Sequence, residues 1–176
     1  MKVSVLNLRN QFQQKNASVP TVPGCYCFWF DKQGMQKILK PLESVCTRKL
    51  QKKVIDGKDC YALYFGIAKN LKDRAKWHIC QHHSMSSVKS GYLSTLRQTL
   101  SALLRLNMSV SEKSVNTFLD EHCYFEYFGK KTLDESRACE ENELCKNYYP
   151  LNIQHNKCVE KQTINSLKHI RKEYRK

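Results

Sequence analysis

Two short aromatic segments constrain the fold of this chain more than any other feature of its sequence. The first, CYCFWF, covers Cys25 to Phe30 and follows the stiff, turn-forming segment VPTVPG. The second, CYALYF, covers Cys60 to Phe65 and stops at Gly66. Aromatic and thiol side chains bounded by proline and glycine are typical of short buried strands. We therefore expect two strands that pair as an antiparallel hairpin.

Helical spacing of apolar residues follows the second strand. Asn70 is a typical N-cap for the apolar repeat LKDRAKWHI that comes after it. A row of leucines predicts a second helix over residues 92–107, with a basic outer face. Two more helices are expected, an acidic one over residues 133–149 and a basic amphipathic one in the final segment INSLKHIRKEYRK.

A third strand is expected over residues 123–128, where HCYFEYFG alternates before Gly129. The order of elements predicts the α+β class, with a three-stranded antiparallel sheet flanked by helices, an inserted helix and a basic C-terminal helix. A length of 176 residues suits one hydrophobic core. We expect a single domain over residues 1–176, with a core over about 19–152, an exposed basic insert over 37–58 and a basic extension over 157–176.

The charge balance indicates the class of partner. Thirty lysines and arginines against sixteen acidic residues give a formal net charge of +14, which favours a polyanion such as nucleic acid. No window approaches the roughly 18 apolar residues of a membrane-spanning helix. The polar N-terminus has no secretory signal pattern, so we expect a cytoplasmic protein whose nine cysteines are reduced thiols.

One set of residues recurs at specific places along these elements. Gly24-Cys25-Tyr26 lies on the first strand and Tyr64-Phe65-Gly66 on the second. Arg74 follows Gly66 by eight residues on the next helix, and His78 lies one turn further on. The acidic helix supplies Glu141-Asn142-Glu143-Leu144-Cys145, followed by Tyr148, Pro150 and Asn152. Taken together, these motifs resemble the signature of the GIY-YIG nuclease superfamily, in the style of its small standalone restriction endonucleases.

Two departures from the family pattern affect the expected site. Ile67 stands where the repair nucleases of the family carry a lysine, and Lys69 is the nearest substitute for that phosphate contact. The interval from Pro150 to Asn152 is one residue shorter than in many members, which leaves the glutamate's register open. We choose Glu141, because its offsets to the following apolar residues then match the family, with Glu140 as the alternative.

The resemblance implies a metal-dependent mechanism, and each residue type suits its expected role. A lone carboxylate suits Mg²⁺, or Mn²⁺, so Glu141 is the expected metal ligand. Arg74 offers a planar fork for two phosphate oxygens. Tyr26 is the expected base, with a pKa lowered by its neighbours, and His78 the relay for its proton. Tyr64 is expected to hold the phosphate or a metal-bound water.

Further residues are expected to contact the nucleic acid. Arg97 and Arg105 form the basic face of the second helix, and Lys69 lies beside the catalytic arginine. Asn152 is expected to orient its neighbours at the site. The basic insert and the tail after Lys157 add further positive charge.

These observations predict a metal-dependent endonuclease that cuts double-stranded DNA. Because one active site cuts one strand, such an enzyme is expected to act as a homodimer. The first alternative is a nucleic-acid-binding module that keeps the fold without cutting. The second is a zinc-stabilised interaction protein that uses His78 and His82, four residues apart, with His122 and Cys123 as further ligands.

Overall fold

Strand β2 lies at the centre of a five-stranded antiparallel sheet in the computed structural model, which describes residues 1–176. All eight of its residues are buried, because strands flank it on both edges and helices cover both of its faces. The order across the sheet is β1-β5-β2-β4-β3. The strands are β1 (Lys2–Ser4), β2 (Gly24–Asp31), β3 (Lys52–Ile55), β4 (Lys58–Ala68) and β5 (Cys123–Gly129).

The α+β class is confirmed, whereas the expected number of strands is wrong. The three predicted strands are β2, β4 and β5, and β2 pairs antiparallel with β4 as expected. The two additional strands, β1 and β3, lie at the edges of the sheet. Both are short and largely polar, KVS and KKVI, so neither carries the alternation by which a strand is recognised in a sequence.

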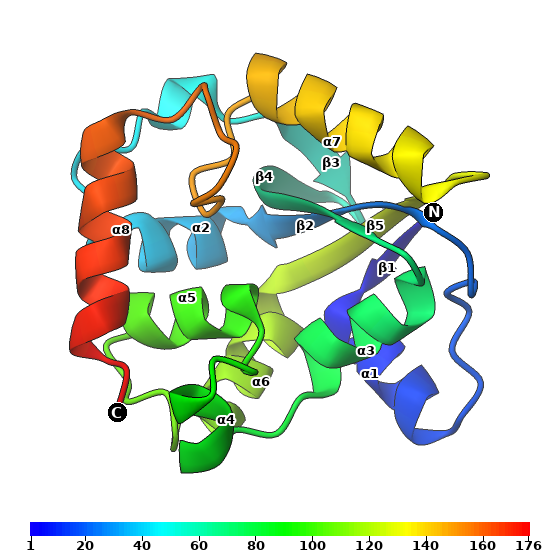
Figure 1. The fold of residues 1–176 in the computed structure, drawn as a ribbon, viewed down its shortest axis with the longest axis horizontal. Helices are drawn as coiled ribbons and strands as arrows, with labels where there is room; N and C mark the ends of the chain where they lie inside the picture. The colour runs from blue at the N-terminus through cyan, green and yellow to red at the C-terminus, as the bar shows by residue number, and fades with distance from the viewer.

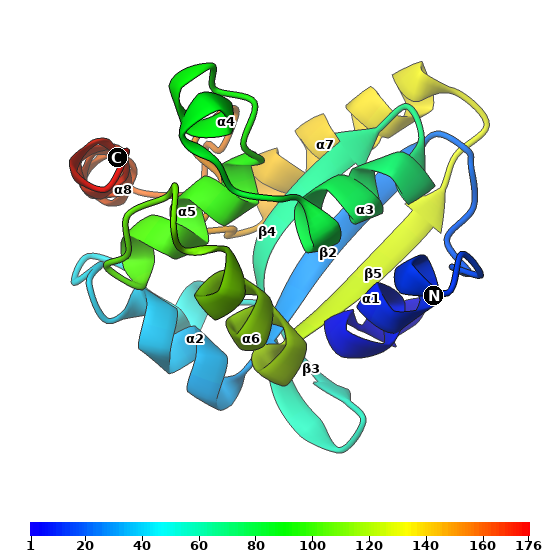
Figure 2. The ribbon, with the colours of Figure 1, turned by 90° about the horizontal axis from the view of Figure 1, so that it is seen from below.

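Helices cover both faces of the sheet. Figures 1 and 2 show α7 on one face, with α3, α5 and α6 on the other. Helix α8 packs beside α5 at the end of the chain. The helices are α1 (Val5–Gln13), α2 (Lys32–Leu39), α3 (Leu71–Cys80), α4 (Met85–Lys89), α5 (Thr95–Leu103), α6 (Glu112–His122), α7 (Leu133–Lys146) and α8 (Lys161–Glu173), with a 3-10 turn at Thr47–Lys49.

The alternation of β2 builds two hydrophobic cores. Tyr26, Phe28 and Phe30 point into the larger core, beneath the helices of the α3 face. Cys25 and Cys27 point into the smaller core, beneath α7. Every second residue therefore reaches the opposite side of the sheet, and Tyr26 lies on the side of α3.

Several expected boundaries need correction. The predicted helix over residues 92–107 is shorter, because the Ser94 side chain caps α5 by accepting a hydrogen bond from the Arg97 backbone N–H. Helix α6, which begins at Glu112, has no counterpart among the expected elements. The insert over residues 37–58 is not simply exposed, because Ile38 and four other residues of it are buried: Leu39, Leu42, Leu50 and Ile55.

Arg97 is not on a basic outer face. Its side chain is fully buried, because α5 is covered by α2, α6 and α8. The guanidinium donates to the carbonyls of His78 and Ile79, both at 3.1 Å, and to Asn116 Oδ1 at 2.6 Å. A cation at the carbonyl end of α3 satisfies groups that the helix itself leaves unpaired. Arg97 therefore fixes the end of α3 and is not available to a phosphate.

The cysteines form no disulfide crosslinks. All nine cysteines are free thiols. Four of them are buried in the sheet: Cys25, Cys27, Cys60 and Cys123. No helix in the structure combines the length and the apolar character that crossing a bilayer requires.

We predict that Arg97→Ala lowers the free energy of unfolding by about 3 kcal/mol or more, because it leaves buried carbonyls unpaired and a cavity behind. Arg105→Ala is the matched control, since Arg105 is an exposed arginine just beyond the same helix. It should change the free energy by less than about 0.5 kcal/mol. Urea unfolding followed by circular dichroism measures both, and equal values for the two variants would contradict the structural role of Arg97.

Candidate active site

A pocket lies at the free edge of β4, where the two faces of the sheet meet. It brings together side chains from β2, β4, α3, α5, α7, α8 and the segment after α7. Its charged and titratable members are Tyr26, Tyr64, Arg74, Glu140, His155 and Arg171. No two neighbouring positions of the chain supply these groups, so only the folded protein assembles them.

Close packing at two glycines places the first tyrosine. Tyr26 pairs with Gly66 across the β2–β4 ladder, and its ring lies directly over that glycine. A Cβ at Gly66 would come within 2.6 Å of the Tyr26 hydroxyl oxygen. At Gly24, a Cβ would come within 2.6 Å of Leu71 at the start of α3. Both glycines therefore leave space for a neighbour, and the second allows α3 to approach β2.

A buried hydrogen-bond chain connects Tyr26 to α5. The Tyr26 hydroxyl lies 2.8 Å from His78 Nε2, and His78 Nδ1 lies 3.1 Å from the Ser94 hydroxyl. Burial, helped by the positive charges of Arg74 and Arg97, holds the pKa of His78 well below its usual value. The imidazole is therefore neutral, and either partner can be the donor in the Tyr26–His78 bond.

The expected lowering of the Tyr26 pKa is not found. Burial, and then the nearby Tyr64 phenol, raises the pKa of Tyr26 well above its usual value, although Arg74 acts in the opposite direction. Burial also raises the pKa of Tyr64, whose ring centroid lies 6.4 Å from that of Tyr26. A phenolate in a nearly dry site loses its hydration. The protein alone therefore keeps both tyrosines protonated.

Arg74 reaches the pocket from α3 and is free of acidic partners. Its guanidinium carbon lies 4.5 Å from the centroid of the Trp77 ring, which supports the group by a cation–π contact. None of the ion pairs in the structure includes Arg74. The fork-shaped donor is thus held in place by an aromatic surface, with its hydrogen-bonding edge available.

The structure brings Glu140, rather than Glu141, into the pocket. Glu140 is half-buried and lies with Arg74 in the pocket wall, whereas Glu141 is exposed. Buried Ser136 and Leu144 lie four residues before and after Glu140, so these three residues form the inward stripe of α7. Glu141 is turned about 100° away from that stripe. The structure therefore places Glu140, the alternative register, in the pocket and Glu141 outside it.

The Glu140 carboxyl has no hydrogen-bonding or ionic partner among the protein's own groups. Burial raises its pKa above the usual range, with His155 and Arg74 acting in the opposite direction. An unpaired, partly buried carboxyl costs free energy unless a cation compensates it. It is therefore the group in the pocket best suited to hold a metal ion.

Asn152 docks the segment after α7 onto the edge of β4. Its side-chain amide donates to the Phe65 carbonyl at 2.7 Å and accepts from the Phe65 N–H at 2.9 Å. The Leu151 N–H donates to the Leu63 carbonyl at 3.0 Å. Because Phe65 lies between the two signature residues Tyr64 and Gly66, this contact sets the end of α7 against them. Asn152 thus holds this segment against β4 through bonds at both its amide oxygen and its amide nitrogen.

Arg171 is a residue of the pocket that no sequence pattern singles out. Arg171 lies on α8, lines the pocket beside Tyr64 and donates to Gln98 Oε1 at 2.5 Å. Burial lowers its pKa, with Tyr64 acting in the opposite direction. The only signal in the sequence was the basic character of the C-terminal helix, which does not say which of its cations turns inward.

The other expected nucleic-acid contacts lie in different places. Lys69 is exposed beside a second pocket that shares Arg74 with the first. Arg105 is exposed beyond the end of α5 and does not line the active-site pocket. Ile67, at the position of the family's lysine, does line the pocket.

The histidines near the end of α3 have separate partners. His78 binds Tyr26, exposed His82 lies 2.9 Å from Glu112, and His83 Nδ1 donates to the Met108 carbonyl at 2.8 Å. His83 Nε2 accepts from Arg97 Nε at 2.6 Å. His122, one of the expected zinc ligands, lies 3.1 Å from Asp31. No group of three or more histidine, cysteine or acidic side chains is arranged to hold a metal ion.

Comparison with known proteins gives one match. The model of the family described as the GIY-YIG catalytic domain matches residues 24–173. The matched stretch begins at Gly24, runs beyond Asn152 and includes the whole of α8. No curated protein and no solved structure matches the chain.

We predict that the protein loses stability as the pH falls from about 6.5 towards 4. Burial and the Arg97 charge lower the pKa of His83 from 6.5 to about 4, and the pKa of His78 is lowered too. The unfolded chain therefore binds protons that the folded chain excludes. The contribution of these histidines to stability is fully present above their pKa in the unfolded chain, and it is lost as the pH falls from there towards the pKa in the folded chain. Urea unfolding at a series of pH values measures the loss.

The variant His83→Gln separates this effect from general acid unfolding. Glutamine keeps an acceptor for Arg97 and does not titrate, so the loss of stability over the same pH range should be smaller by on the order of 1 kcal/mol. An unchanged pH dependence in His83→Gln would contradict the assignment of that contribution to His83.

Proposed function

This chain belongs to the GIY-YIG nuclease superfamily, and from that premise we propose that it is a metal-dependent endonuclease that hydrolyses phosphodiester bonds in double-stranded DNA. One observation carries the proposal. Tyr26, Tyr64, Arg74 and Glu140, which come from four different elements, meet in one pocket. Packing alone does not require two phenols, a free guanidinium and an unpaired carboxyl to converge.

The pocket fits Mg²⁺, or Mn²⁺, bound by few protein ligands. Mg²⁺ keeps most of its waters and takes one or two carboxylates together with phosphate oxygens of the substrate. Glu140 is the only acidic residue that lines the pocket, and it would hold the metal from the α7 side. When bound, the ion supplies charge neutralisation at the phosphoryl oxygens and lowers the pKa of water.

The two arginines hold the substrate phosphate. Arg74, supported by Trp77, offers its fork to two non-bridging oxygens of the phosphate. Arg171 approaches from α8, on the side of Tyr64, and supplies a second positive charge. Arg171 thereby replaces the positive charge of the lysine that other family members carry at the position of Ile67. The Tyr64 hydroxyl lies between these groups and positions the phosphate or a water molecule.

The Tyr26–His78 pair moves the proton of the attacking water. Since Tyr26 is protonated and His78 is neutral, the tyrosine hydroxyl accepts the water's proton while passing its own proton to Nε2. The net change is the loss of one proton by water and its gain by the imidazole. This route avoids a free phenolate in a buried site. The water's oxygen then attacks phosphorus, and the leaving oxygen takes a proton from solvent.

DNA is the partner that the charge and the family favour. The net charge of +14 supplies affinity for a phosphate backbone. The enzyme acts as a homodimer in this proposal, because each active site cuts one strand and a double-strand break needs two. The function is that of a restriction-type or related endonuclease.

We predict that Glu140→Gln and Arg74→Ala each lower the rate of plasmid cleavage in Mg²⁺ by a factor of about 10² or more, because each removes a group that compensates transition-state charge. Glu141→Gln is the matched control for Glu140→Gln and should cut like the wild type, since Glu141 points away from the pocket. Gel electrophoresis of supercoiled plasmid, with and without Mg²⁺, measures cleavage, and fluorescence anisotropy confirms equal DNA binding.

The paired glutamate variants distinguish the possible outcomes. Loss of cleavage in Glu141→Gln alone would return the metal ligand to the register first expected from the sequence. If the wild type binds several unrelated DNAs and cuts none of them with Mg²⁺ or Mn²⁺, the protein is the binding module instead.

We predict a smaller effect for the second arginine. Arg171→Gln should lower the cleavage rate by about tenfold or more, because the phosphate keeps Arg74 and loses one of two charges. Arg175→Gln, four residues later, just beyond the end of α8 and outside the active-site pocket, is the control and should retain the wild-type rate. Equal cleavage by both variants would remove Arg171 from the site.

A further inference from the structure

A second pocket lies on the other side of Arg74 from the active-site pocket. Its volume is about 750 Å³, and it opens to solvent. Arg74 is the one residue that lines both pockets, so the two sites share a wall. The remaining lining residues are Thr21, Ala68, Lys69, Asn70, Asp73, Trp77 and Tyr92.

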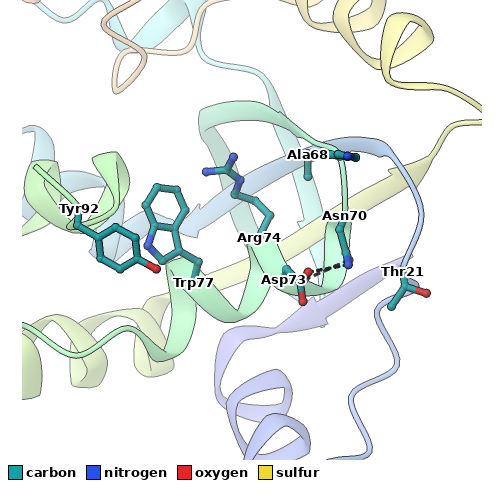
Figure 3. Close-up of a pocket in the computed structure, with 8 residues that line it drawn as sticks. Thr21, Ala68, Asn70, Asp73, Arg74, Trp77 and Tyr92 are labelled. Carbon is teal, nitrogen blue, oxygen red and sulfur yellow. Dashed lines mark hydrogen bonds between the residues drawn. The ribbon is translucent and has the colours of Figure 1, made fainter.

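A row of two aromatic rings and a guanidinium forms one side of this pocket. Figure 3 shows Tyr92, Trp77 and Arg74 side by side, with Asp73 and Asn70 beyond them. The rings of Trp77 and Tyr92 lie 6.2 Å apart at 53°, and the Arg74 guanidinium lies 4.5 Å from the Trp77 ring. Tyr92 is 67% exposed, so the face of its ring is accessible to a ligand.

The polar groups of the pocket have unused hydrogen-bonding capacity. The Trp77 indole N–H is buried and has no hydrogen-bond partner. Asp73 accepts from the Asn70 side chain through Oδ2 at 2.7 Å, and its other oxygen has no partner. Lys69 and Arg74 are cations without an acidic partner in the structure. The pocket therefore offers donors, an acceptor and an aromatic surface in one place.

These features match the parts of a nucleotide. A nucleobase has a flat face that stacks on aromatic rings and an edge of donors and acceptors. The phosphate on the other side of its sugar carries the negative charge that Arg74 binds. Bases inside a duplex are paired and stacked, so only an unpaired base can enter a pocket of this kind.

We propose that this second pocket holds an unpaired nucleobase next to the scissile phosphate. The base stacks on Tyr92 beside Trp77, while Arg74 holds the adjoining phosphate in the active-site pocket. This inference rests on the proposed nuclease function. It implies that the enzyme binds DNA best where a nucleotide beside the cut is single-stranded or turned out of the helix.

Binding of a short oligothymidylate to the full chain tests the proposal independently of cleavage. The parent protein is Glu140→Gln, which removes the metal-binding carboxyl, and anisotropy of a labelled oligonucleotide gives Kd. Tyr92→Ala should weaken oligothymidylate binding by about fivefold or more, the loss of one base–aromatic stack. Tyr92→Phe keeps the ring and should bind like the parent. Binding of a blunt, fully paired duplex should be unchanged in both variants.

A fluorescent base reports the stacking itself. An oligonucleotide with 2-aminopurine should lose fluorescence when bound by the parent and by Tyr92→Phe, and should keep it with Tyr92→Ala. The proposal is overturned if Tyr92→Ala binds oligothymidylate like Tyr92→Phe, or weakens duplex and single strand equally. If the wild type cuts DNA and Tyr92→Ala does not change binding, the nuclease function stands and the base pocket is excluded. If the protein stacks a base through Tyr92 and never cuts DNA, the base pocket stands and the nuclease function is excluded.

Discussion

The contact between the Tyr26 ring and Gly66 is the constraint on which the rest of the site depends. Since no side chain larger than hydrogen fits between them, β2 and β4 must pair in one register. That register puts Tyr64 on the same face of the sheet as Tyr26. It also leaves β4 to run directly into α3, whose first turn packs against Gly24. The two phenols and Arg74 are thus placed by backbone packing before any polar contact is made.

A second set of contacts adds the carboxyl to this framework. Past Tyr61, where its pairing with β3 ends, the outer edge of β4 has no strand beside it. Asn152 bonds to both the N–H and the carbonyl of Phe65 at this edge. Leu144 packs in the smaller core on the other side of the sheet and fixes the rotation of α7. Glu140 therefore reaches the edge of β4 from one face of the sheet while Arg74 reaches it from the other. The active-site pocket exists because the two cores meet at this edge.

Burial determines the charges of the site. It raises the pKa values of the two tyrosines and of Glu140, and it lowers that of His78. The neutral forms of these groups are favoured until a cation or a phosphate enters. Arginine keeps its charge under these conditions, which is why Arg74 and Arg171 are the positive groups at the pocket. An apolar or aromatic support, such as Trp77 under Arg74, holds a cation without neutralising it.

The sequence by itself determined the elements with strong local patterns. The aromatic runs of β2 and β4, the alternation of β5 and the capped repeat of α3 each specify one element, because periodicity and capping act over a few residues. The order and spacing of the short motifs on those elements carried the resemblance to the family, and that resemblance selected Tyr26, Tyr64, Arg74 and His78. All four of these residues meet at the site, and all four come from the β2–β4–α3 unit.

Only the tertiary structure decided the remaining features. Edge strands as short as β1 and β3 form because a neighbouring strand offers free hydrogen-bonding groups. Arg97 is buried because other helices cover α5 on the side that its own periodicity leaves polar. Glu140 replaces Glu141 because one residue turns a helix by about 100°, and packing of Leu144 sets that rotation. Arg171 joins the pocket from a distant part of the chain. Each of these outcomes depends on contacts between elements, and local sequence patterns carry no information about such contacts.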